Sequence, residues 1–131
     1  MDKKTKVNRN YQRKSFEVKF YESLLKERPD FVEVLISLGD IYTKKGFYRE
    51  GLAVDKKLAS LRPEDPIIHY NFACSLSLSG QVKEALQELK RAVLLGYDEF
   101  DYISADPDLK NLRKLPESHI FLDKLKKIKQ K

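Results

Sequence analysis

Residues 65–96 have the sequence DPIIHYNFACSLSLSGQVKEALQELKRAVLLG, which is typical of two amphipathic helices joined by a turn at Ser79-Gly80. Shifted back by 34 residues, this stretch coincides with an earlier one that has the same pattern. The coinciding pairs are Gly80 with Gly46, Glu84 with Glu50, Leu86 with Leu52, Leu95 with Leu61, and Ala73 with Gly39. A self-match at this period indicates a helical repeat, in which each unit buries its apolar face against the next. The sequence therefore predicts an all-α protein built from helix pairs.

Two complete helix pairs are predicted, over 31–64 and 65–98. The first contains helices from about 31 to 44 and from about 48 to 61, with Gly46 at the turn between them. The second contains helices over roughly 66–79 and 82–95, and Asp65 before Pro66 is a typical N-cap followed by a proline in the first helical position. Pro29 lies 34 residues before Pro63, so a preceding helix within 11–29 occupies the place of a repeat's second helix.

After the second pair the pattern changes. Residues 97–102 are acidic and aromatic without a helical stripe, which predicts an ordered, non-helical connection. Asp106-Pro107 then predicts the start of a brief helix through Lys114, and Pro116 separates this helix from a last one. We expect 106–130 to form capping helices that cover the open end of the stack.

Charge is distributed unevenly along the 131 residues. The total is +6, but residues 1–14 carry +5, residues 110–131 carry +6, and the centre carries −5. We expect 1–10 to be a disordered basic tail, since these residues are polar without periodicity. The chain has no apolar run of the ~18 residues that a membrane span needs, and no apolar region follows the basic N-terminus as in a signal peptide. We therefore expect a cytoplasmic protein without membrane contact.

The residues of the helix pairs resemble the tetratricopeptide repeat (TPR), a motif written W-x2-L-G-x2-Y…A-x3-F…P. The matching residues are Leu35, Leu38-Gly39, Tyr42, Gly51, Asp55 and Pro63 in the first pair, and His69, Phe72-Ala73, Leu76, Ala85, Leu89 and Tyr97 in the second. Asp55 stands where the motif has a large apolar residue. The segment ADPDLKNLRKLP is also similar to the closing module of many bacterial TPR proteins. This resemblance implies a TPR-like α-solenoid of antiparallel helix pairs with a C-terminal helical cap.

Catalytic and metal-binding interpretations find little support in the sequence. His69 and Cys74 are five residues apart on one helix, about 140° apart around its axis, and so do not face one point. His69 is more simply explained as filling a packing position and Cys74 as a small residue that is buried or lines a groove. Asp106 and Asp108 are explained by N-capping, and His119 stands alone. No phosphate loop, GxSxG or HExxH motif is present. We expect no catalysis, no cofactor and no metal.

The TPR resemblance implies a binding role. In stacked TPR pairs the first helix of each pair lines a concave groove that holds an extended peptide or a helix of a partner. In this chain the groove residues would be Glu33, Ile36, Asp40, Thr43 and Lys44 from one helix and Tyr70, Asn71, Cys74, Ser77 and Leu78 from the next. Tyr70 and Asn71 are the strongest candidates, since one is an amphipathic aromatic and the other can bond a peptide backbone.

Some TPR proteins use Lys and Asn in this groove to bind a C-terminal carboxylate. This chain has Asn71 at one such place but Ile36 and Asp40 at others, and Asp40 would repel a carboxylate, so a co-chaperone role of that kind is rejected. The sequence thus favours a scaffold for another protein or peptide.

The alternative is that the basic ends bind nucleic acid or an acidic partner through residues such as Lys3, Lys4 and Lys6 or Lys124, Lys126, Lys127, Lys129 and Lys131. These ends lack interleaved aromatics and any known nucleic-acid motif, so nucleic acid is the weaker prediction. Self-association through Phe47, Phe100 and Tyr102 is also open.

Overall fold

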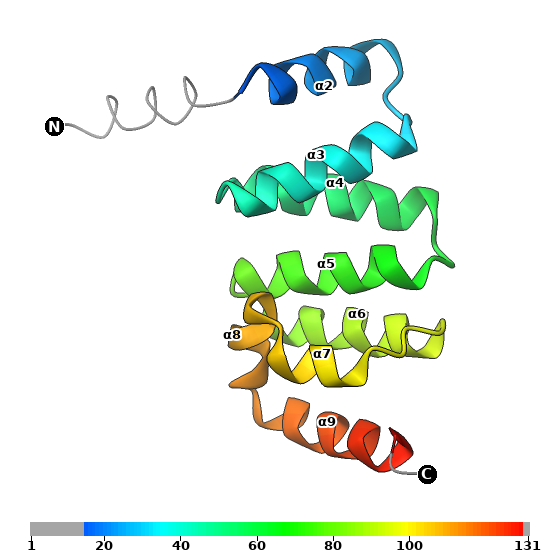
Figure 1. The fold of residues 1–131 in the computed structure, drawn as a ribbon, viewed down its shortest axis with the longest axis vertical. Coiled ribbons are helices and arrows are strands. Elements are labelled where there is room, and N and C mark those ends of the chain that lie inside the picture. Colours follow the sequence, from blue (N-terminus) through cyan, green and yellow to red (C-terminus); the bar gives the residue numbers. More distant parts are fainter. Residues whose placement is uncertain (1–14, 130–131) are drawn as a thin grey trace, which may run out of the picture.

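The computed structural model describes residues 15–129, which form eight α-helices and one 3-10 helix, with no β-strand among these residues. The elements are α2 (Phe16–Glu27), α3 (Val32–Lys44), α4 (Tyr48–Leu61), α5 (Pro66–Leu78), α6 (Val82–Leu94), α7 (Phe100–Ala105), η1 (Pro107–Leu109), α8 (Lys110–Arg113) and α9 (Pro116–Lys129). From α2 to α6, each helix packs against the next in the sequence, and the helices follow one another along the long axis of the molecule (Figure 1). The predicted all-α fold is confirmed. Over the described residues, no helix is both long enough and apolar enough to cross a membrane.

The turns repeat with the period of the sequence. Gly46 and Gly80 have φ angles of +82° and +81°, a conformation that glycine adopts without steric cost. After each glycine, the next backbone N–H donates to a carbonyl of the preceding helix, from Phe47 to Tyr42 at 2.8 Å and from Gln81 to Leu76 at 2.9 Å. These bonds satisfy carbonyl groups that the helix end would leave unpaired. The turns predicted at Gly46 and at Ser79-Gly80 are confirmed.

The two N-caps predicted from Asp-Pro pairs are also present. Asp65 Oδ1 accepts hydrogen bonds from the backbone N–H groups of Ile67 at 2.9 Å and Ile68 at 3.3 Å. Asp106 Oδ1 accepts from the backbone N–H of Asp108 at 2.9 Å. The helix expected within 11–29 is described from Phe16 onward, and the tail predicted over 1–10 lies outside the described residues.

Most of the buried apolar side chains belong to the second pair and to residues 100–129, which we call the C-terminal segment. The largest cluster joins α5 and α6 to α7, η1, α8 and α9. Buried members from the C-terminal segment are Ile103, Leu109, Leu112, Leu122 and Leu125. Two smaller clusters hold the N-terminal part together, one centred on Val18, Leu38 and Tyr42 and the other on Leu35, Leu58 and Ile68.

The prediction of a non-helical connection over 97–102 is wrong in part, because α7 begins at Phe100. This helix has one fully buried residue, Ile103, which packs into the largest cluster, so tertiary burial rather than a helical stripe stabilises it. Phe100 follows Pro66, the first residue of α5, by the repeat period, and Pro116 follows Val82, the first residue of α6, by the same period.

The C-terminal segment therefore begins its two main helices at the repeat spacing, like a third helix pair, and the first of them is broken at Pro107. Proline has no N–H for a helical hydrogen bond, so the chain changes direction there and continues as η1 and α8. The buried residues Ser118, Leu122 and Leu125 of α9 follow Ala85, Leu89 and Ala92 of α6 by one position less than the repeat period. The buried face of α9 is thus displaced by one position relative to that of α6.

Candidate partner-binding hollow

A hollow of about 550 Å³ opens between α3, α5 and the C-terminal segment. Its lining comes from four places along the chain: Ile36, Ser37, Gly39, Asp40, Thr43 and Lys44; Asp55 and Leu58; Asp65, Ile67, Ile68, Tyr70, Asn71, Cys74 and Ser75; and Tyr102, Asp106 and Asp108. The name hollow is used below for this cavity together with these lining residues. Residues 36–44 belong to α3 and residues 67–75 to α5, the first helices of the two pairs.

Seven of the ten predicted groove residues line the hollow, namely Ile36, Asp40, Thr43, Lys44, Tyr70, Asn71 and Cys74. The other three do not. Glu33 is exposed near the start of α3, and Leu78 is half-buried at the end of α5. Ser77 is fully buried, and its Oγ accepts a hydrogen bond from the backbone N–H of Leu112 at 3.1 Å. Ser77 thus holds α5 to α8, which leaves it no surface for a partner.

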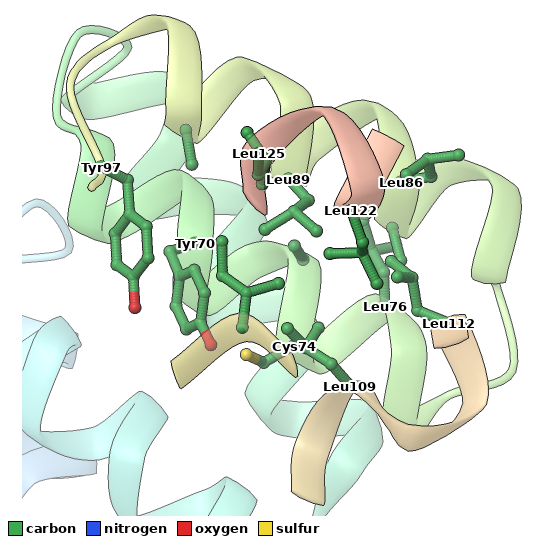
Figure 2. Close-up of a cluster of buried hydrophobic side chains, with 14 residues drawn as sticks. Tyr70, Cys74, Leu76, Leu86, Leu89, Tyr97, Leu109, Leu112, Leu122 and Leu125 are labelled. Carbon is green, nitrogen blue, oxygen red and sulfur yellow. The ribbon is translucent and has the colours of Figure 1, made fainter. Parts of the chain in front are cut away.

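Tyr70 lines the hollow, but most of its side chain is covered by contacts within the protein. Only 5% of it is exposed, and its ring stacks on Tyr97 with 4.1 Å between the ring centroids. Figure 2 shows the two rings side by side, with the Cys74 sulfur close to the Tyr70 oxygen. The Tyr70 hydroxyl donates to Asp106 Oδ2 at 2.5 Å. Asn71, the next residue, is exposed and is the better position at which to probe binding.

Cys74, Asp106 and Asp108 meet at one wall of the hollow, with one ligand atom from each within 4.8 Å of the others. The Cys74 thiol donates to Asp106 Oδ2 at 3.7 Å, the same oxygen that accepts from Tyr70. Burial, and next the negative charge of Asp106, raises the pKa of this thiol well above its ordinary value. Asp106 Oδ1 also accepts from the backbone N–H of Asp108, so hydrogen bonds join the three residues.

His69 faces away from that cluster, as the helical spacing predicts. Its Nδ1 lies 2.7 Å from Glu88 Oε2 on α6, and its Nε2 lies 2.7 Å from the carbonyl oxygen of Pro63. The residue is 2% exposed, so it fills a packing position and also bonds two neighbouring segments. His119 is exposed, with Nε2 2.8 Å from the carbonyl oxygen of Arg113.

Asp55 is a buried acid whose importance the sequence did not reveal. It stands where the TPR motif has a large apolar residue, and it is 6% exposed at the contact between α4 and α5. The Ser75 hydroxyl donates to its Oδ2. Burial raises the pKa of Asp55 to about 6, and Asp40 adds to this rise, while the bond from Ser75 opposes it. The departure of Asp55 from the TPR motif was the one sequence feature that pointed to this position. The hydrogen bond from Ser75 could not be predicted from it.

The hollow is strongly acidic. Five aspartates line it, and the lysine Lys44 is the one cation among the described residues of its lining. Lys44 Nζ already lies 2.9 Å from Asp40 Oδ2, in a pair that is mostly exposed. Burial raises the pKa of Asp108, and the neighbouring charges of Asp106 and Asp40 raise it further. Asp106 and Asp108 were predicted only as capping residues, because sequence spacing does not show that the C-terminal segment folds back beside α5.

No protein-family model matches the chain. Over 76 residues, 56% of the chain, it is 37% identical to a protein of Arabidopsis thaliana whose name describes it as chloroplastic. Over 55 residues, 42% of the chain, it is 40% identical to a TPR repeat-containing thioredoxin of the same plant. The chain covers 23% and 8% of the lengths of these two relatives. The second name agrees with the resemblance to TPR proteins drawn from the residues.

Proposed function

We propose that this protein is a non-catalytic scaffold of the TPR type that binds an extended peptide or a helix of a partner protein in the hollow. The observation that carries the proposal is the placement of the hollow, which lies along α3 and α5, the first helices of the two pairs. The match to a TPR repeat-containing protein supports the same role. A cytoplasmic location remains a prediction.

Three exposed apolar side chains at the hollow give a partner surface to bury. Ile36, Ile67 and Tyr102 are 44%, 54% and 52% exposed. Their burial by a partner would contribute at roughly 25 cal/mol for each Å² of apolar area removed from water. Cys74, the one thiol in the chain, is buried, and its thiol donates to Asp106 Oδ2 within the protein.

A photo-crosslinking amino acid at Asn71 tests the proposal. The matched control places it at Gln87, which is also exposed but lies on α6 and outside the hollow. We expect partner adducts from an extract of the native host at position 71 and none at position 87. Asn71→Arg, which fills the hollow, should abolish capture, and Gln87→Arg should leave it unchanged.

Two outcomes contradict the proposal. Equal adducts at both positions, or full capture by Asn71→Arg, would remove the hollow from partner binding. Loss of capture on neutralising the exposed lysines of α9, Lys124, Lys126 and Lys127, would instead favour the alternative function through the basic ends.

A further inference from the structure

Among the described residues, no ion pair involves Asp106 or Asp108, whereas Asp40 pairs with Lys44 at an exposed position. The two described groups that donate side-chain hydrogen bonds to Asp106 are the Tyr70 hydroxyl and the Cys74 thiol, both neutral. Arg113 is close enough to reach this region, but its Nη1 donates to backbone oxygens, that of Asp106 at 2.7 Å and that of Ile103 at 3.0 Å. The negative charge of the carboxylates therefore remains available to a bound cation.

The negative charge of Asp106 also acts on the titratable groups beside it. The charge of Asp106 is the largest cause that raises the pKa of Tyr102, at the rim. Burial, and then the charges of Asp106 and Asp40, raises the pKa of Asp108. A cation bound in the hollow would lie within a field of one sign at a partly enclosed surface, where charges are screened less than in open solvent.

We propose that the segment bound in the hollow belongs to a partner protein and carries a Lys or Arg side chain flanked by apolar residues. This inference rests on the proposed function and adds the chemistry of the partner. The cation would pair with Asp108 and with Asp40, which already holds Lys44 in an exposed pair, and the buried charge of Asp106 would lie beside it. The flanking apolar side chains would cover Ile36, Ile67 and Tyr102. A peptide that ends in a free carboxylate at this place, or one rich in acidic residues, is disfavoured by the same charges.

Selection of peptides on the full chain tests the inference. A library of random peptides displayed on phage is selected on the immobilised protein, and the selected sequences are synthesised with a fluorescent label. We expect Lys or Arg to recur at one position with apolar neighbours. Replacing that Lys or Arg by Gln should weaken binding, measured by fluorescence anisotropy, by about fivefold. Added salt should also weaken binding.

The protein variant is Asp40→Asn with Asp108→Asn, which should weaken binding by about fivefold. Its matched control is Asp98→Asn with Asp123→Asn, two exposed acids outside the hollow, which changes the net charge by the same amount. The control should bind as the wild type does. Equal loss in both variants would overturn the inference, because it would assign the effect to total charge.

The remaining outcomes separate this inference from the proposed function. Selected peptides that lack Lys and Arg but lose binding with Asn71→Arg overturn the inference and leave the proposed function standing. Selected peptides that Asn71→Arg does not affect overturn both. Cross-links from a probe at Asn71 to residues 1–14 of the same chain would assign the hollow to its own basic segment and would also overturn the inference.

Discussion

Asp55→Asn should stabilise the protein at neutral pH, and the gain should disappear in acid. Asp55 is buried between α4 and α5, where burial raises the pKa of its carboxyl group to about 6. Asparagine has nearly the same shape and can still accept the hydrogen bond from the Ser75 hydroxyl, but it carries no charge. The substitution therefore removes the cost of burying the charge and keeps the contact between the two helix pairs.

The size of the effect follows from the two pKa values. The ordinary value is 3.8 and the folded-state value is about 6, a difference of about 2 pH units. At 1.36 kcal/mol for each pH unit, the ionised carboxylate costs the folded state about 3 kcal/mol. Because the folded-state pKa is the higher one, the folded state binds more protons between about pH 4 and pH 6. The stability that the neutral carboxyl group contributes is complete below about pH 4 and is lost as the pH rises through about 6.

The measurement is urea unfolding of wild type and Asp55→Asn from pH 4 to pH 8, with the free energies subtracted at each pH. Subtraction removes the titration of groups that both proteins share, including Asp108. We expect a difference near zero at pH 4 that grows to about 3 kcal/mol in favour of Asp55→Asn above pH 7. A difference that does not change with pH would refute the argument, since it would show that Asp55 titrates alike in the folded and unfolded chains.

Three further perturbations test the packing, a turn and the buried thiol. Ala73→Leu overpacks a fully buried position of α5 and should lower the free energy of unfolding in urea by about 1–3 kcal/mol. Asn71→Leu, on the exposed side of the same helix, should not lower it. Equal effects of the two substitutions would contradict the repeat register. Gly80→Ala should cost about 1–2 kcal/mol through backbone strain alone, since φ is +81° and no atom lies within 4 Å of the added Cβ; an unchanged urea midpoint would rule that strain out. Cys74 should react with a thiol reagent far more slowly in the native protein than in urea, because burial and Asp106 raise the pKa of its thiol; equal rates would mean that the thiol is open to solvent.

The helix pairs could be predicted because their signals are local. A glycine with positive φ, an Asp-Pro cap and an apolar residue every three or four positions each act within one turn of helix. Helix α7 has no such stripe, and it depends on the burial of Ile103 by residues from other elements. This helix therefore depends on tertiary packing, and the residue pattern within 97–102 could not predict it.

Within the hollow, the sequence predicted the contribution of α3 and α5 but not that of the C-terminal segment. The TPR resemblance implied that the first helix of each pair lines a groove, and Ile36, Asp40 and Thr43 recur on one face of α3 at the helical spacing. Asp106 meets Tyr70 across 36 positions of chain, and that contact depends on the direction of the chain after Pro107. Ser77 was predicted to line the groove but does not line the hollow, because α8 covers the side of α5 on which Ser77 lies.

The helix break at Pro107 explains how Asp106 comes to line the hollow. Asp106 stands one repeat period after Phe72, a half-buried aromatic in the continuous helix α5. If the first helix of the third pair were continuous, position 106 would lie in the middle of a helix, where an acid would have no capping role. Because Pro107 ends that helix, Asp106 becomes the N-cap of η1 and its other carboxylate oxygen reaches Tyr70. The same change of direction carries Leu109 and Leu112 into the core. The path of the chain at Pro107 thus places apolar side chains in the core and the Asp106 carboxylate at the hollow.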